Sequence, residues 1–428
     1  MNSILAGGYL ALWILTLVWY QMKEHSFDGG SAVIMTYIVY ATFSLLTILN
    51  PLFSTLFDPL RLFPYIYLYL MMMIALMPLI SHHLHPADRI EEPSTRVLPL
   101  TAGIIIVSSI LLLPDIIQNF GTGIVKLFTD TEAGKEAYME QSSNAEDAGG
   151  SISNLPAVIY NMLSDLAVFL CFFYMTLGKK RIIMTALLFF SIIIGLLIPI
   201  MNGQRGGLII SFLTVIGGYM LFKRYLSKKI NRIVSVLGIV MVIGVTLPIV
   251  AITMSRFGNK AAGVGGFVSW YVGQGSLYFN NSALEAGGTR HGDRTINLIK
   301  RVVYPDTPKN YSERRDKYRN LKIDDNIFST FVGDFTSDFG PVTAAVIFVI
   351  FFFYVTMRIR PDNGTIKVHQ LLLLYFALCI SMQGGIALFS YSDTGNLRMF
   401  ALLGLYAYLR YHEALLKKFP LKQTSDEQ

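Results

Sequence analysis

The 428-residue chain carries little charge for its length. Only 15% of its residues are Asp, Glu, Lys or Arg, whereas about a quarter are charged in a typical soluble domain. Hydrophobic residues make up 53% of the chain, and the mean hydropathy is +0.50. A soluble core of this size needs far less apolar surface, so the composition excludes a soluble globular protein and predicts a lipid bilayer as the solvent.

The chain also has few residues that form disulfides or metal sites. Its two cysteines, Cys171 and Cys379, lie in apolar stretches, where a thiol packs as a small hydrophobic group, and we expect neither a disulfide nor a metal site from them. The sequence contains no nucleotide-binding glycine loop, zinc-ligand cluster or nucleophile elbow. His82, His83 and His85 have no carboxylate or cysteine at ligand spacing, so we interpret them as part of a solvated interfacial loop.

Long apolar windows are abundant. Windows of about 17 to 22 residues match the length of helix that crosses the hydrocarbon core of a membrane. The first window, 4–20, has no basic residue before it and no cleavage site after it, so we expect a retained span and not a signal peptide. The predicted fold is all-α: a single polytopic membrane domain, 1–428, with about eleven transmembrane helices. The predicted spans are 3–20, 32–49, 63–80, 98–113, 155–177, 182–200, 208–222, 233–253, 341–357, 370–389 and 397–411.

The distribution of lysine and arginine predicts the orientation. Clusters of these residues fall on one side of the predicted topology, at 178–181, 223–232, 358–360 and 417–418. Short loops rich in Lys and Arg mark the cytoplasmic side. The opposite side then receives an acidic extracytoplasmic loop, 114–154, and a large basic extracytoplasmic loop, 254–340, between spans eight and nine.

The large loop is rich in cations on the side where positive charge is otherwise scarce. Long loops cross the membrane largely regardless of their charge, so the predicted topology stands. The excess of cations indicates an anionic partner. Within the loop, 296–304 is predicted to form a short amphipathic helix at the membrane surface.

Two arginines are predicted at the outer border of the bundle. Arg205 lies between glycines in a short turn. Glycines allow a ligand to approach the backbone closely, and a guanidinium can hold a phosphate through two parallel hydrogen bonds. Arg256 follows span eight and falls on the same face, so the two would suit a pyrophosphate. For both residues the alternative is an arginine that reaches from a helix end to the membrane surface.

Two aspartates lie four residues apart just before span nine. In a helix Asp334 and Asp338 share one face. A carboxylate beside a membrane cavity can have a raised pKa and act as a general base. The alternative for Asp338, which we favour, is a cap for span nine, and Asp334 is open to either interpretation.

Aromatic and amide side chains lie close together in the stretch 270–281, which contains Tyr271 and Gln274. Stacking faces beside hydrogen-bonding edges suit sugars. Tyr and Trp also gather at membrane interfaces for amphipathic reasons, and without context that interpretation is the safer one.

Three elements carry a resemblance to a known family: 204–207, 271–281 and 331–340. With these elements, and with its layout of about eleven spans and a large outer loop, the chain resembles the Wzy-type O-antigen and capsular polysaccharide polymerases, the oligosaccharide repeat unit polymerases. The resemblance implies a metal-independent membrane glycosyltransferase at the outer face of the bacterial inner membrane. Such an enzyme transfers a growing glycan from its polyprenyl pyrophosphate carrier to a sugar hydroxyl of the next lipid-linked unit.

The resemblance also suggests roles for the candidate residues. Arg205 and Arg256 would hold the pyrophosphate, and a carboxylate or His291 would take the proton from the attacking hydroxyl. The remaining candidates would assist as further pyrophosphate ligands, as proton acceptors or in substrate binding: Gln204, Tyr271, Gln274, Glu285, Arg290, Arg294, Asp334 and Asp338.

The expected partners are polyprenyl-pyrophosphate-linked oligosaccharide, membrane lipids and a chain-length regulator protein, with no nucleic acid, metal or cofactor. Two other functions fit the same layout. A flippase would move the lipid-linked oligosaccharide without joining it, and an O-antigen ligase would pass finished polysaccharide to another acceptor.

Overall fold

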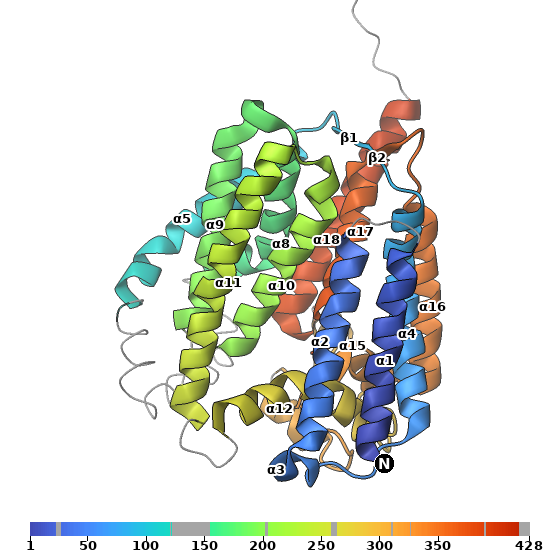
Figure 1. Cartoon of the computed structure of the whole chain (residues 1–428). Coiled ribbons are helices and arrows are strands. Elements are labelled where there is room, and N and C mark those ends of the chain that lie inside the picture. Colours follow the sequence, from blue (N-terminus) through green and yellow to red (C-terminus); the bar gives the residue numbers. More distant parts are fainter. Residues whose placement is uncertain are drawn as a thin grey trace, which may run out of the picture.

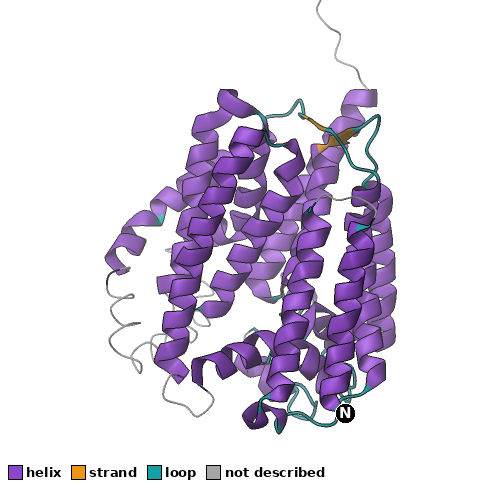
Figure 2. Cartoon of the chain, viewed as in Figure 1, coloured by secondary structure: helices purple, strands orange, loops and turns teal. Residues whose placement is uncertain are grey.

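The computed structural model describes residues 1–22, 27–119, 121, 155–201, 204–257, 263–309, 311–325, 327–388 and 391–418. Most of these residues lie in helices, and the only strands among them form one small sheet (Figure 2). The predicted all-α class is therefore confirmed for the described part of the chain.

Nine helices within the described ranges are long and apolar enough to cross a membrane. They are α1 (Asn2–Gln21), α2 (Gly29–Leu49), α4 (Leu62–Leu84), α5 (Val97–Leu111) with its helical continuation to Asn119, α8 (Leu155–Thr176), α9 (Ile182–Met201), α10 (Arg205–Phe222), α11 (Lys228–Phe257) and α16 (Pro341–Arg358). The protein is thus a multi-pass membrane protein. The last two predicted spans correspond to α17 (Val368–Gln383), which has 16 residues, and to α18 (Ser392–Lys418), so the count of eleven stays a prediction.

Helix α17 lies at the centre of the bundle. Every side chain from Leu371 to Gln383 is buried. A helix that is surrounded by protein needs no polar face and can be apolar on all sides. For this reason the hydropathy of this short segment predicts a membrane span.

The cationic turns gather at one end of the bundle, at the top of Figure 1. This end holds η2 (Gly178–Arg181), η3 (Lys223–Tyr225) and the end of α18. It also holds the sheet, in which β1 (Arg89–Glu91) runs parallel to β2 (Thr365–Lys367) with Ile90 opposite Ile366. That arrangement agrees with the predicted topology, and the assignment of this end to the cytoplasm stays a prediction.

One expectation at this end is wrong. His82 and His83 do not lie in a solvated loop, because both belong to the last turn of α4, and the His83 side chain is only 3% exposed. The apolar part of α4 extends farther than the hydropathy window indicated, since Leu84 is still helical.

The segment 254–340 contains folded helices packed against the bundle. It includes α12 (Gly263–Tyr278), the π-helical turn η4 (Phe279–Ala283), α13 (Asn297–Val303), α14 (Tyr311–Lys317) and α15 (Thr330–Phe339). Helix α12 runs across the lower end of α2 (Figure 1), and α13 confirms the short helix predicted over 296–304. A Cβ at Gly273 would overlap the backbone carbonyl of Phe43, so this close crossing of α12 and α2 requires glycine.

The start of α16 corrects the capping interpretation of Asp338. The N-cap is Gly340, with φ of 79°, and no side chain caps this helix end. Pro341 occupies the first turn, where its missing N–H costs nothing. The Asp338 carboxylate binds elsewhere, as described below.

The predicted acidic loop, 114–154, lies outside the described residues except at its start. The helical conformation of α5 continues to Asn119, so the first residues of that predicted loop extend a membrane helix.

Candidate functional site

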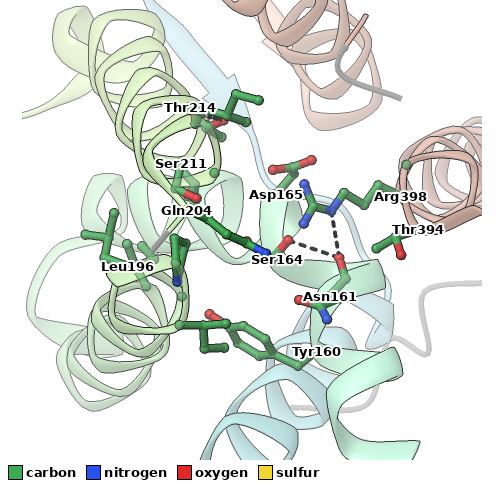
Figure 3. Close-up of a pocket in the computed structure, with 18 of the residues that line it drawn as sticks. Tyr160, Asn161, Ser164, Asp165, Leu196, Gln204, Ser211, Thr214, Thr394 and Arg398 are labelled. Carbon is green, nitrogen blue, oxygen red and sulfur yellow. Dashed lines mark hydrogen bonds between the residues drawn. The ribbon is translucent and has the colours of Figure 1, made fainter. Parts of the chain in front are cut away.

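A polar cavity of about 510 Å³ lies between α8, α9, α10 and the start of α18 (Figure 3). Along α10 it reaches from Gln204 to Thr214, which is about 15 Å at 1.5 Å per residue. That depth is roughly half of a hydrocarbon core about 30 Å thick. The cavity therefore extends from one end of the bundle toward its middle. Its polar lining includes Tyr160, Asn161, Ser164, Asp165, Ser211 and Arg398.

A carboxyl group and a guanidinium face the same cavity. Asp165 of α8 is 6% exposed, and its Oδ2 has no hydrogen-bond partner within the described part of the chain. Arg398 of α18 donates from Nε to the carbonyl oxygen of Asn161 at 2.9 Å, and Figure 3 shows its guanidinium pointing toward Asp165. A charge among membrane helices is costly, so such residues mark functional sites by default.

Neither Asp165 nor Arg398 is among the residues predicted from the sequence. The signal was present, because Asp165 is the only charged residue in the predicted span 155–177. A charge inside a span is a functional hypothesis on its own. Arg398 lies at the edge of the predicted span 397–411, where an arginine reaching the membrane surface is the ordinary interpretation.

Several predicted residues meet in a second, buried group, which we call the ionic cluster: Arg290, Arg294, Arg314, Asp325, Asp334 and Asp338. Arg290 Nε lies 2.8 Å from Asp338 Oδ1, and Arg294 Nε lies 2.8 Å from Asp334 Oδ1. Asp325 is shared by all three arginines. Three cations thus meet three carboxylates, so much of the positive charge that indicated an external anionic partner is neutralised within the chain.

The ionic cluster fastens the basic segment to its surroundings. Asp338 Oδ2 accepts hydrogen bonds from the backbone N–H and the hydroxyl of Thr295, both at 2.8 Å. Asp334 Oδ2 accepts from the N–H of Leu388 at 2.7 Å. Charge-assisted bonds of this kind are about twice as strong as neutral ones. The cluster therefore joins the stretch before α13 to α15 and to the link between α17 and α18.

The carboxylates of the ionic cluster differ in proton affinity. Burial opposes ionisation of Asp325, but Arg294, Arg290 and Arg314 outweigh it and lower its pKa to about 2. At Asp334 burial dominates and raises the pKa, although Arg294 offsets part of the effect. Asp334 therefore accepts a proton more readily than Asp325.

The ionic cluster lies directly behind the cavity. The Arg294 guanidinium stacks 4.6 Å from the ring centroid of Tyr391, and Tyr391 lines the cavity. One aromatic ring thus separates the cavity from the Arg294–Asp334 pair, so a ligand in the cavity is within electrostatic reach of it.

The predicted residues of α10 and α12 surround a neighbouring contact. Gln204 lines the cavity, but Arg205 turns the other way, and its Nη1 donates to Thr253 Oγ1 of α11 at 3.2 Å. The Arg205 guanidinium also lies 4.5 Å from the ring centroid of Tyr271. Gln274 is buried and donates from Nε2 to the Tyr271 carbonyl at 3.2 Å. Arg205 therefore ties α10 to both α11 and α12.

Three other predicted residues do not join either group. Glu285 pairs with Arg61 at 2.6 Å, and both side chains are largely exposed. His291 is exposed, with Nδ1 lying 3.1 Å from the hydroxyl of Thr289. Arg256 belongs to the last turn of α11, and its side chain lies outside the described residues.

Within the described ranges, no three His, Cys, Asp or Glu side chains are grouped so that they could hold a metal ion. No model of a known protein family, no curated protein and no solved structure matches this chain.

Proposed function

We propose that the protein polymerises polyprenyl-pyrophosphate-linked oligosaccharide repeat units into O-antigen or capsular polysaccharide at the outer face of the bacterial inner membrane. One observation carries the proposal: Asp165 and Arg398 face the same polar cavity inside a bundle of membrane helices. The resemblance of 204–207, 271–281 and 331–340 to the Wzy-type polymerases also supports it.

The proposed reaction is a metal-independent glycosyl transfer. A hydroxyl oxygen of the incoming repeat unit forms a bond to the anomeric carbon of the growing chain, and the bond from that carbon to the carrier pyrophosphate breaks. The hydroxyl proton passes to a carboxylate, and the pyrophosphate leaves with an additional negative charge. The protein must therefore supply a base on one side of the anomeric carbon and a cation on the other.

Asp165 and Arg398 fit these two roles. Asp165 has an oxygen that no described donor occupies, so it can accept a proton from a hydroxyl. Arg398 keeps its terminal nitrogens toward the cavity (Figure 3) and can hold phosphate oxygens in pairs. The amide and hydroxyl groups of Gln204, Asn161 and Ser211 line the same space and supply the polar edges that a sugar needs.

The ionic cluster has a supporting role in this proposal. Asp334 has a raised pKa and lies behind Tyr391, which makes it the second candidate for the proton acceptor. Arg290 and Asp338 are occupied by each other, so we assign them to positioning the stretch before α13, behind the cavity.

The test is complementation of a deletion strain, followed by gel separation of the surface glycans. Arg398→Gln and Asp165→Asn should abolish the ladder of long chains while single repeat units remain attached to their final acceptor. Arg410→Gln is the matched control, because Arg410 lies on the same helix about 18 Å farther along and bonds only to tyrosine hydroxyls among the contacts described. Arg205→Ala should also remove long chains while the protein stays in the membrane, because Arg205 holds α10, which lines the cavity, against α11 and α12.

The alternatives give different gels. If the deletion removes all surface glycan and lipid-linked material accumulates, the protein is a flippase or a ligase and the polymerase proposal fails. If Arg398→Gln and Asp165→Asn leave a normal ladder, the cavity is not the site of polymerisation.

A further inference from the structure

A second cavity, of about 620 Å³, lies at the opposite end of the bundle. It is enclosed by the start of α2, the end of α4, the turn after α10 and part of α11. This is the end where the cationic turns gather (Figure 1). Its polar and charged lining includes Asp28, His82, His83, Lys223, Arg224 and Asn231.

His83 lines this cavity, and one of its ring nitrogens has no partner among the described residues. Its Nδ1 lies 2.7 Å from Asp28 Oδ2, and the Tyr20 ring stacks on the imidazole with centroids 4.1 Å apart. A carboxylate oxygen accepts from an imidazole N–H, so this contact assigns the ring N–H to Nδ1, which donates a hydrogen bond to Asp28. The other nitrogen, Nε2, is buried and has no partner among the described residues. Leaving a buried polar atom unpaired costs about 1–3 kcal/mol, so Nε2 needs a hydrogen-bond partner, which a water molecule or a ligand can supply.

The Asp28 carboxylate has no spare capacity for a ligand of its own. Its Oδ1 accepts from the backbone N–H of Ser31 at 2.9 Å and from the Ser31 hydroxyl at 3.1 Å. Its Oδ2 accepts from the Tyr20 hydroxyl at 3.1 Å and from His83. Asp28 thus orients His83 and caps α2, and its negative charge is shared among four donors.

The rest of the wall is positive. Lys223 lines the cavity and donates from Nζ to the Phe27 carbonyl at 3.3 Å. Arg224 pairs through Nη2 with Asp88, an exposed carboxylate, at 2.9 Å. The backbone of Gly29 and Gly30 forms the first turn of the 21-residue helix α2, where N–H groups lack intrahelical acceptors and the helix dipole favours anions. The Lys223 ammonium, the Arg224 guanidinium and this helix end supply donors for an anion, whereas the one carboxylate in the described part of the wall, Asp28, is already occupied.

We propose that this cavity binds a phosphate group, either as a free phosphate or as the headgroup of a lipid. Phosphate oxygens accept from Lys223, Arg224 and the first turn of α2, and a P–OH donates to Nε2 of His83. Leu79, Met220 and Leu221 line the same cavity and offer apolar contacts to a lipid-borne phosphate. The site lies at the far end of the bundle from the proposed polymerisation site, so it is independent of the proposed function.

The experiment uses the purified full-length protein in a phosphate-free maltoside detergent. In one arm, inorganic phosphate is titrated and binding is followed by thermal unfolding. In the other arm, native mass spectrometry compares the binding of phosphatidic acid with that of diacylglycerol carrying the same acyl chains. The variants are His83→Gln and Lys223→Gln. The matched controls are His85→Gln and Lys228→Gln, which change the same residue types at the same end but do not line the cavity.

Wild-type protein should bind at least one of the two phosphate probes, and both cavity variants should weaken that binding about tenfold or more, with the controls unchanged. If the cavity variants bind phosphatidic acid more weakly than the wild type does, the ligand is a lipid headgroup. If they bind inorganic phosphate more weakly, the ligand is a free phosphate. The proposal is overturned if inorganic phosphate does not bind and phosphatidic acid binds no better than diacylglycerol. It is also overturned if the control variants weaken binding as much as the cavity variants do. Because Lys223 lies at the exposed rim, Lys223→Gln keeps the test decisive even if His83→Gln does not fold.

Discussion

Replacing Asp338 with Asn is the sharpest test of the ionic cluster. Asp338 is fully buried and accepts from Arg290 Nε at 2.8 Å and from the backbone and hydroxyl of Thr295, both at 2.8 Å. The neutral amide has only one acceptor oxygen. Its NH₂ group must therefore face either the guanidinium or the Thr295 donors, and one set of buried donors loses its partner.

The expected cost follows from the number of remaining partners. Removing one partner of a buried ion pair typically costs about 3–5 kcal/mol. Because Arg290 retains Asp325, we take the lower end, about 3 kcal/mol, which is a factor of about 150 in a local opening equilibrium.

Hydrogen exchange measures this opening directly. The Arg290 amide donates to the Ser337 carbonyl at 2.9 Å, so peptides that cover 286–298 should exchange about 150-fold faster in Asp338→Asn. The control is Asp316→Asn, which breaks an exposed pair with Arg319 and should change exchange in that region little, since surface pairs contribute about 0–1 kcal/mol. Equal exchange in the two variants would refute the conclusion that the ionic cluster holds this segment in place.

Three further predictions concern other parts of the structure. The pKa of Asp325 is lowered to about 2, so its stabilising contribution is complete above the ordinary value of 3.8 and is lost as the pH falls from about 4 to 2. Unfolding temperatures measured over that range should fall less steeply in Asp325→Asn than in the wild type, and parallel curves would contradict the assignment. Gly273→Ala should lower the unfolding temperature in detergent, because a Cβ there meets the backbone of α2, whereas Gly265→Ala on the same helix has open space and should not. A reporter fused near the exposed residue Arg315 should give an extracytoplasmic signal, and a cytoplasmic one would place both cavities on the wrong faces of the membrane.

The candidate site could be predicted from sequence only where the signal was local. That Asp334 and Asp338 share one face of a helix was predictable, because a spacing of four places two residues on the same face wherever the chain is helical. Their partners were not. Arg290 meets Asp325 across 35 residues and Asp338 across 48, and no periodicity connects such positions.

The same distinction explains the two cavities. Asp165 comes from α8 and Arg398 from α18, and only the packing of those helices turns both toward one space. At the other end, three histidines in sequence suggested a solvated loop. Asp28, 55 residues before His83, instead holds that imidazole inside the bundle.

The sequence by itself determined the solvent, the helical class and most of the helix positions, because a bilayer imposes a fixed length of apolar helix on each crossing. It also determined which turns carry positive charge. Tertiary structure alone decided which charges are neutralised inside the protein and which face a cavity. The physical reason is that a charge among membrane helices is stable only beside a partner, and that partner comes from a distant segment whose position depends on how the helices pack.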